Sequence, residues 1–247
     1  MDYVLNTPYT GADDVGMLIV EPLQGEGGYV APPPEWLPMI KAACEKHGAL
    51  LVTDEVQAGA GRTGKMWSIE HSGVEPDMLT WGKGMGGDMP SAGLSIRKDH
   101  AEKIVDSSQP NTFAGNAVTA ATTITNIEIL RENNFELVNR AGDLGEEIKG
   151  WLTEGAKETR TIGDVRGRGL MIGIEMVKDK KTKEPLDGDS MGNIIMGMLN
   201  RGLVMVPCGR FGTVFRFMPP LIITKKHAQK GTEILLETVK AVESGGA

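Results

Sequence analysis

The sequence is poor in cysteine and histidine, and both shortages exclude classes of site. Its 247 residues include two cysteines and four histidines. Cys44 and Cys208 lie far apart in the sequence, so we expect two free thiols in a reducing cytoplasm rather than a disulfide framework. The histidines show no spacing typical of metal ligands and no Cys–His cluster exists, so we expect no metal site.

The chain has fewer basic than acidic residues, and it lacks long apolar runs. The 33 acidic and 26 basic residues give a formal net charge of −7, which argues against nucleic acid or an anionic membrane as a main partner. No apolar run approaches the roughly 18 residues of a membrane span, and the N-terminus lacks the basic and apolar regions of a signal peptide. We therefore expect a cytoplasmic protein without a nucleic-acid or membrane partner.

Short apolar runs in the first half of the chain predict an α/β fold. Residues 17–20, 49–53, 78–81 and 91–96 read as strands, and the apolar spacing of residues 36–46 is helical. Strands separated by helical segments favour a mostly parallel sheet, which carries its sites at the carboxyl ends of the strands.

The composition changes after a long helix expected over residues 117–131. We therefore expect two domains, 1–134 and 135–247. The second is predicted to hold helices and extended segments, the helices at 137–154, 191–199 and 225–242 and the extended segments at 164–177, 203–206 and 214–218.

Lys83 is the most informative residue, because it follows an apolar run and opens a Gly-rich turn. Upstream, another apolar strand ends on Asp54. A cofactor that bonds a lysine through its aldehyde carbon also needs a carboxylate to hold its pyridinium nitrogen. The alternatives are a solvated lysine and a capping or loop aspartate; the glycines beside Lys83 count against the first, since a solvated lysine needs no close backbone approach.

Six blocks stand in the order seen in class III aminotransferases, and the chain resembles this family from about Asp14 to about Val242. The blocks are residues 20–28, 54–57 with 61–64, Lys83, 111–116, 167–170 and 216–221. The resemblance implies a pyridoxal-phosphate enzyme of fold type I. It implies the C-terminal part of the large, mostly parallel-sheet domain followed by a small α+β C-terminal domain, without the Gly-Ser phosphate cradle of the full-length enzymes.

The resemblance also assigns the cofactor residues. Lys83 would bond pyridoxal 5'-phosphate and act as general base and acid, and Asp54 would hold the pyridine nitrogen. Gln57 resembles the residue that binds the phenolic oxygen, and Val56 the apolar contact on one ring face, although a plain core role suits Val56 almost as well. Thr112 is similar to the threonine that reaches the phosphate across a dimer interface, or it caps the helix that starts at residue 117.

Glu26 and Arg216 resemble the substrate end of aminotransferases that act on ω-amines. The implied donors are ω-amino acids of the 4-aminobutyrate or 2,4-diaminobutyrate type, and the implied acceptor is a 2-oxo acid such as 2-oxoglutarate. A solvated loop acid and a surface cation are the alternative readings. Other enzyme classes also stay open, namely a dialkylglycine decarboxylase or racemase, and a half-chain that is inactive until a homo-oligomer or a complementing N-terminal half completes it.

Overall fold

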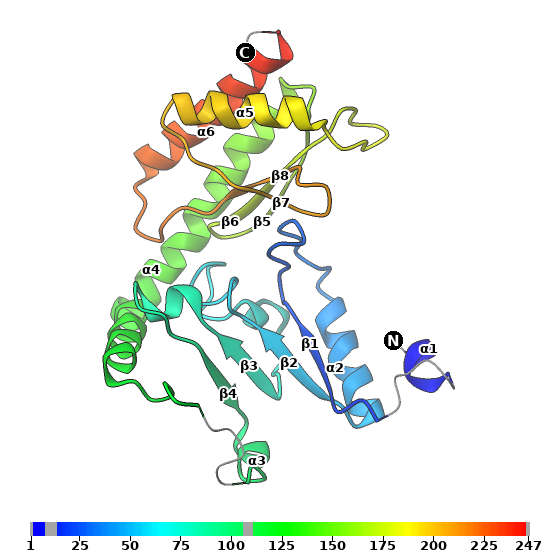
Figure 1. Cartoon of the computed structure of the whole chain (residues 1–247), viewed down its shortest axis with the longest axis vertical. Helices are drawn as coiled ribbons and strands as arrows, with labels where there is room; N and C mark the ends of the chain where they lie inside the picture. Colours follow the sequence, from blue (N-terminus) through cyan, green and yellow to red (C-terminus); the bar gives the residue numbers. More distant parts are fainter. Residues whose placement is uncertain (1, 8–13, 106–110, 246–247) are drawn as a thin grey trace. The chain divides into compact units, whose positions relative to one another are not determined.

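The computed structural model describes residues 2–7, 14–105 and 111–245, and the chain divides into two compact units (Figure 1). Each unit includes segments from separate parts of the sequence, and each is described here by itself. Unit 1 consists of Met1–Pro22, Pro32–Gly61 and Lys65–Glu136, and unit 2 of Leu23–Ala31, Arg62–Gly64 and Leu137–Ala247.

Unit 1 is built on a four-stranded sheet of order β1-β2-β3-β4. Its strands are β1 (Met17–Val20), β2 (Leu50–Asp54), β3 (Met78–Trp81) and β4 (Gly93–Ile96). The first three are parallel and β4 runs antiparallel to β3. The predicted α/β architecture with a mostly parallel sheet is confirmed.

Helix α2 (Trp36–His47) links β1 to β2 and covers one face of the sheet (Figure 1). Its buried Cys44 packs with Leu51 of β2, while Leu18 and Val20 of β1 contact the same cluster. The helix ends at Gly48, whose φ of 68° is a left-handed conformation that glycine adopts at little cost.

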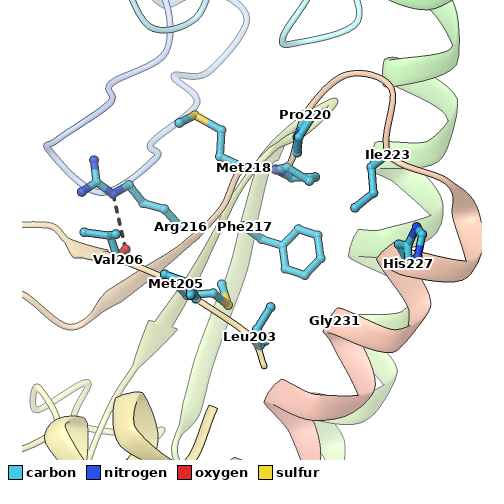
Figure 2. Close-up of a pocket in the computed structure, with 12 residues that line it drawn as sticks. Leu203, Met205, Val206, Arg216, Phe217, Met218, Pro220, Ile223, His227 and Gly231 are labelled. Carbon is cyan, nitrogen blue, oxygen red and sulfur yellow. Dashed lines mark hydrogen bonds between the residues drawn. The ribbon is translucent and has the colours of Figure 1, made fainter. Parts of the chain in front are cut away.

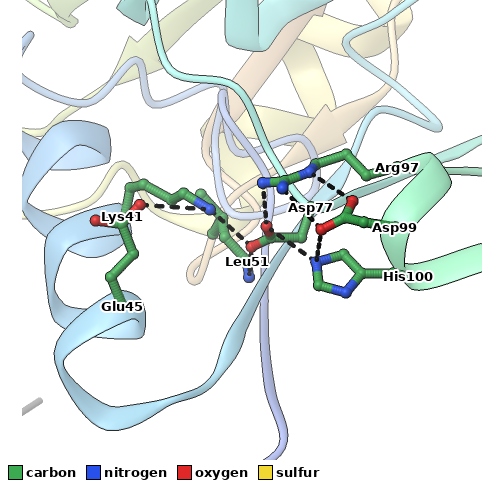
Figure 3. Close-up of polar contacts among 7 residues, drawn as sticks. All are labelled: Lys41, Glu45, Leu51, Asp77, Arg97, Asp99 and His100. Atoms are coloured by element: carbon green, nitrogen blue, oxygen red, sulfur yellow. Dashed lines mark hydrogen bonds and ion pairs between the residues drawn. The ribbon is translucent and has the colours of Figure 1, made fainter. Parts of the chain in front are cut away.

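A buried carboxylate just before β3 joins α2, β2 and Arg97, the residue that follows β4 (Figure 3). Asp77 is 4% exposed, and its carboxylate accepts from the Lys41 ammonium and from the Leu51 amide, both at 2.8 Å. The guanidinium of Arg97 donates to its other oxygen at 3.1 Å. Burial opposes the charge, yet the hydrogen bonds from Lys41 and the Leu51 amide hold the pKa of Asp77 below its usual value. The pairing ties together the amino ends of the parallel strands β2 and β3, which lie opposite the carboxyl ends where α/β proteins carry their sites.

The remaining elements of unit 1 are short apart from the first part of a long helix. They are α1 (Asp2–Asn6), η1 (Ser68–Ser72), η2 (Lys83–Gly86) and α3 (Lys98–Ala101). Helix α4 (Ala117–Lys157) passes from unit 1 into unit 2 and is interrupted by four residues with non-helical backbone angles: Glu132 (ψ 145°), Asn133 (φ 47°), Asn134 (φ 57°) and Phe135 (φ 62°). Asparagine tolerates the left-handed region better than most residues, which favours a break here.

Unit 2 is an antiparallel sheet of order β5-β6-β8-β7 packed against helices. The strands are β5 (Ile162–Arg168), β6 (Met171–Met176), β7 (Pro207–Cys208) and β8 (Val214–Phe217), and α5 (Gly188–Asn200), α6 (Lys225–Glu243) and the second part of α4 complete the unit. Nineteen buried residues form one core cluster here, with Ile148, Ile172 and Phe215 fully buried.

The expectation of one extended segment over residues 164–177 was wrong, because this stretch is the hairpin β5–β6. Its turn includes Gly169 at φ 52°, where a Cβ atom would lie 2.5 Å from the carbonyl carbon of Thr63. Only glycine permits that approach, and it brings residues 62–64 into unit 2. The expected strand at 203–206 is not formed either, and only Pro207–Cys208 pairs with β8.

Within the described ranges, no helix combines the length and apolarity that crossing a membrane requires. The same residues contain no cluster of three or more histidine, cysteine, aspartate or glutamate side chains able to hold a metal ion.

Candidate functional site

Asp54 and Lys83 leave the same edge of the unit 1 sheet. Asp54 is the last residue of β2 and pairs in register with Thr80 of β3, three residues before Lys83. Since β2 and β3 are parallel, both side chains start from the carboxyl ends of adjacent strands. Asp54 is half-buried, and its Oδ1 accepts from the Val56 amide at 3.0 Å. The structure thus places the two residues that the sequence singled out at one edge.

Lys83 sits on an unusual backbone conformation. Its φ is 44°, a left-handed value that costs a non-glycine residue of order 1 kcal/mol. The turn is held by Asn126 of α4, whose Nδ2 donates to the carbonyls of Gly84 at 2.7 Å and Met85 at 3.2 Å. The side chain of Lys83 is exposed, so the fold fixes the backbone of this lysine while leaving its amine accessible.

A buried hydroxyl without a partner faces the same side of the sheet as Asp54. The Oγ1 atom of Thr80 accepts and donates no hydrogen bond among the described residues, although it is shielded from solvent. Paired residues of neighbouring strands project to the same face, so Thr80 and Asp54 share one face. Val56 and Gln57 follow Asp54 in a half-buried turn. This edge therefore carries polar groups of several kinds that suit a polar aromatic cofactor: the carboxylate of Asp54, the amine of Lys83, the carboxamide of Gln57 and the hydroxyl of Thr80.

Thr112 lies in a turn of unit 1 and is exposed. The sequence allowed Thr112 to cap α4, but Asn116 caps this helix instead. Its Oδ1 accepts from the amides of Val118 at 3.0 Å and Thr119 at 3.2 Å. The hydroxyl of Thr112 is therefore left without this capping role.

The second group of predicted residues meets in unit 2, where Arg216 of β8 forms an ion pair with Glu26, 190 residues earlier. The Arg216 side chain is 17% exposed and that of Glu26 is 69% exposed. Arg216 also donates through Nε to the Val206 carbonyl at 3.3 Å and through Nη2 to the Pro207 carbonyl at 3.4 Å. The guanidinium is thus anchored by backbone carbonyls, whereas its carboxylate partner stands largely in solvent.

Two residues that the sequence did not single out fix the Glu26 loop. Tyr29 is fully buried, and its hydroxyl donates to Sδ of Met218 at 3.0 Å. Burial raises the pKa of Tyr29 above its ordinary value, so the phenol stays neutral. On the other side, the Arg166 guanidinium donates to the Gly28 carbonyl at 2.9 Å. In the sequence, the available sign of this role was that Tyr29, a large aromatic residue, directly follows Gly27 and Gly28.

Arg62, which lies in the sequence block at residues 61–64, also holds this region. Its guanidinium donates to the Pro219 carbonyl, just beyond β8. The carbonyl of Arg62 accepts from the Leu170 amide at 3.0 Å. These bonds tie the end of β8, and with it Arg216, to the β5–β6 hairpin.

Glu55 is a buried carboxyl between Asp54 and Gln57 to which the sequence gave no role. It is 2% exposed and accepts from the amides of Ser68 at 2.8 Å and Ile69 at 2.7 Å. Burial raises its pKa to about 7, and the two amide donors only partly oppose this. Glu55 therefore fastens the start of η1 beneath the turn that carries Val56 and Gln57.

Replacing Glu55 with glutamine is expected to change stability in a pH-dependent way. A folded-state pKa raised to about 7 means that the stability contributed by protonated Glu55 is full below its ordinary pKa and is lost as pH rises through 7. Glu55→Gln stays neutral, so its stability relative to the native chain should rise by up to about 3 kcal/mol between pH 4.5 and pH 8. Urea denaturation at both pH values measures this. A difference that does not change with pH would contradict it, and Glu35→Gln, at an exposed position, is the control.

The chain matches a family model described as aminotransferase class-III over residues 4–239. It is 34% identical over 223 residues to the 4-aminobutyrate aminotransferase GabT of Escherichia coli (strain K12), covering 90% of this chain and 52% of that protein. It is 38% identical over 245 residues to an alanine/serine racemase of Pyrococcus horikoshii, covering 99% of this chain and 50% of the racemase. The chain thus spans about half the length of the curated relatives it matches.

Solved structures agree with these matches. A transaminase from the marine bacterium Virgibacillus superposes with a TM-score of 0.87 at 29% identity, covering 94% of this chain and 54% of the other. The ornithine δ-aminotransferase of Plasmodium falciparum gives a TM-score of 0.83 at 31% identity, over 94% of this chain and 58% of the other.

Proposed function

This chain belongs to the class III aminotransferase family, and from that premise we propose that it is part of an enzyme that moves an amino group from an ω-amino acid to a 2-oxo acid. The donor would be of the 4-aminobutyrate or 2,4-diaminobutyrate type and the acceptor a 2-oxo acid such as 2-oxoglutarate. The family depends on pyridoxal phosphate and has the fold type I architecture, in agreement with the sequence prediction. Residues 1–134 would be the C-terminal part of the cofactor-binding domain and residues 135–247 the small domain.

The cofactor would lie at the carboxyl edge of β2 and β3. Bound there, it would supply an electron sink for the bonds at the carbon that carries the substrate's amino group. Asp54 would hold the ring nitrogen in its charged form, Gln57 the phenolic oxygen and Val56 one ring face. The Nζ atom of Lys83 would anchor the group and move the proton of the substrate carbon. Thr112 would bind the phosphate.

The ion pair between Glu26 and Arg216 is the observation that carries the substrate assignment. Arg216 offers a planar, bidentate partner for a carboxylate. While Glu26 holds it, the site suits a donor whose reacting end carries no carboxylate, as in an ω-amino acid. When Glu26 swings into solvent, Arg216 is free to bind the carboxylate of a 2-oxo acid. The backbone carbonyls of Val206 and Pro207 keep Arg216 in place in both cases.

Racemisation is the second candidate, favoured by the 38% identity to the alanine/serine racemase over 99% of this chain. A racemase needs no 2-oxo acid, so the two functions differ in one reagent. Incubation of a single amino acid enantiomer with and without 2-oxoglutarate separates them. Formation of the second enantiomer without any acceptor supports racemisation, and amino transfer that needs the acceptor supports the aminotransferase.

Trapping the cofactor tests the proposal directly. The purified chain is mixed with pyridoxal phosphate, reduced with borohydride and mapped by peptide mass spectrometry. Because Lys83 has an exposed side chain and follows the strand next to the one that ends at Asp54, we expect the label on Lys83. Label scattered over surface lysines would contradict the proposed site.

Catalysis would require completion of the site by a homo-oligomer or by a complementing N-terminal half, which would supply the part of the enzyme that this chain does not match, in the cytoplasm. The expected Thr112 role across an interface is one reason. Measurable transamination by the purified chain alone would refute this requirement.

A further inference from the structure

Three residues in register cross the sheet of unit 2 as one row. Arg166 of β5 pairs with Gly173 of β6, and Gly173 pairs with Arg216 of β8. Paired residues of neighbouring strands project to the same face, so the two arginines stand on one face of the sheet with a glycine between them. The row therefore has a guanidinium at each end and a gap without a side chain at its centre.

The loop that carries Glu26 lies in this gap. A Cβ atom on Gly173 would stand 2.9 Å from Cβ of Tyr29 and 3.2 Å from the carbonyl oxygen of Gly28. The loop thus approaches the sheet more closely than a side chain at position 173 would allow without a shift. The carboxylate that pairs with Arg216 is therefore carried by a loop that rests on the sheet residue beside Arg216.

Arg166 holds this loop from the other end of the row. Its Nε donates to the Gly28 carbonyl at 2.9 Å. Its Nη1 donates to the carboxylate of Asp164 at 2.9 Å and to that of Glu175. Because hydrogen bonds from a planar guanidinium have fixed directions, the two carboxylates orient Arg166 so that its Nε faces the loop.

Arg216 holds the same loop through the side chain of Glu26. Figure 2 shows Arg216 bonded to the Val206 carbonyl, which anchors the guanidinium. The backbone of Glu26 is anchored as well, since its carbonyl accepts from the Gly209 amide at 2.9 Å. The strength of the ion pair then depends on how closely the loop is held over Gly173. A looser loop weakens the pair and leaves Arg216 open to other carboxylates.

We propose that Arg166 is a positioning residue that determines how strongly Glu26 competes with a substrate carboxylate for Arg216. The inference rests on the proposed function, in which Arg216 binds Glu26 and the 2-oxo acid in turn. The apparent affinity of Arg216 for a carboxylate falls as the fraction of molecules in which Glu26 occupies it rises. By holding the loop down, Arg166 favours donors without a carboxylate at their reacting end over α-amino acids.

Chemical modification of Arg216 tests this without cofactor or turnover. The full chain is treated with phenylglyoxal, which modifies accessible guanidinium groups, and peptide mass spectrometry follows Arg216 with the exposed Arg131 as internal reference. Arg166→Met should raise the modification rate of Arg216 about three- to tenfold, the range that corresponds to the net contribution of one hydrogen bond. Glu26→Gln, which removes the ion pair itself, should raise this rate at least as much.

Three further variants complete the comparison, with circular dichroism as the check on folding. Gly173→Ala lifts the loop while Arg166 is intact, so it should also raise the modification rate of Arg216. Arg166→Lys keeps the charge but not the directed bonds, so its rise should be smaller than that of Arg166→Met. Arg201→Met removes an arginine of the same unit that pairs with Glu237 at 3.5 Å, and it should leave the rate unchanged.

The two half-reactions give the functional readout, under conditions in which the native chain transfers amino groups. Arg166→Met should lower KM for 2-oxoglutarate about three- to tenfold, because Glu26 then competes less well for Arg216. The half-reaction with the ω-amino donor should slow, and α-amino acids should become better donors. Loss of structure alone would instead slow both half-reactions.

An unchanged modification rate in Arg166→Met, beside a raised rate in Glu26→Gln, would overturn the inference. Equal losses in both half-reactions would also overturn it. No rise in either variant would mean that the ion pair does not restrain Arg216, and the inference would fail with the pair. Modification rates as expected in a protein that transfers no amino group would count against the proposed function alone.

Discussion

Replacing Lys83 with alanine is expected to remove the borohydride-trapped label and to lower transamination by at least ~10⁴-fold, because covalent attachment and proton transfer are lost together. Asn126 donates to the carbonyls of Gly84 and Met85 and so holds the turn in place without the Lys83 side chain, so the variant should fold. Steady-state rates, measured with the complementing half present, give the comparison.

The matched control for this variant is Lys98→Ala, at a lysine whose side chain is 90% exposed in α3. It should keep both the label and the rate. A loss below tenfold in Lys83→Ala would show that Lys83 is a surface lysine and would move the search to another amine.

Replacing Arg216 with alanine is expected to lower kcat/KM for the 2-oxo acid by roughly 30- to 5,000-fold, the effect of about 2–5 kcal/mol for truncating a hydrogen-bonded charge pair. The half-reaction with the ω-amino donor should lose much less, because Glu26, not the substrate, is then the partner of Arg216. Single-turnover rates of the two half-reactions measure these two losses separately.

Arg216→Lys is the matched variant. It keeps the charge but loses the planar fork, so an intermediate loss for the 2-oxo acid is expected. Equal losses in both half-reactions would instead mean that Arg216 acts only by holding the carbonyls of Val206 and Pro207, and would contradict the switch with Glu26.

Much of the fold could be predicted from local patterns. The runs at 17–20, 49–53 and 78–81 gave strands, and the spacing within residues 36–46 gave α2, because burial of one or both faces imposes a period that a short window reveals. The pair Asp54 and Lys83 could be predicted for the same reason, since each ends an apolar run and the ends of parallel strands share an edge.

Other features had no local signal. Residues 164–177 alternate like one strand, but the chain turns at Gly169 and Leu170 and forms a hairpin, with Gly169 packed close against residues 62–64. Glu55 reads as one more acid in a polar turn. Its burial and its two amide partners come from η1, more than ten residues away.

The sequence by itself therefore determined the family and most of the strand and helix types, and it singled out candidate reactive residues, because periodicity, turn chemistry and motif order can be read from consecutive positions. Tertiary structure alone decided that the Arg216 guanidinium is anchored by the carbonyls of Val206 and Pro207, that Tyr29 and Arg166 fix the Glu26 loop, and that one face each of β1 and of residues 203–206 is exposed. Pairing and burial depend on which distant segments pack together, and no local pattern specifies that.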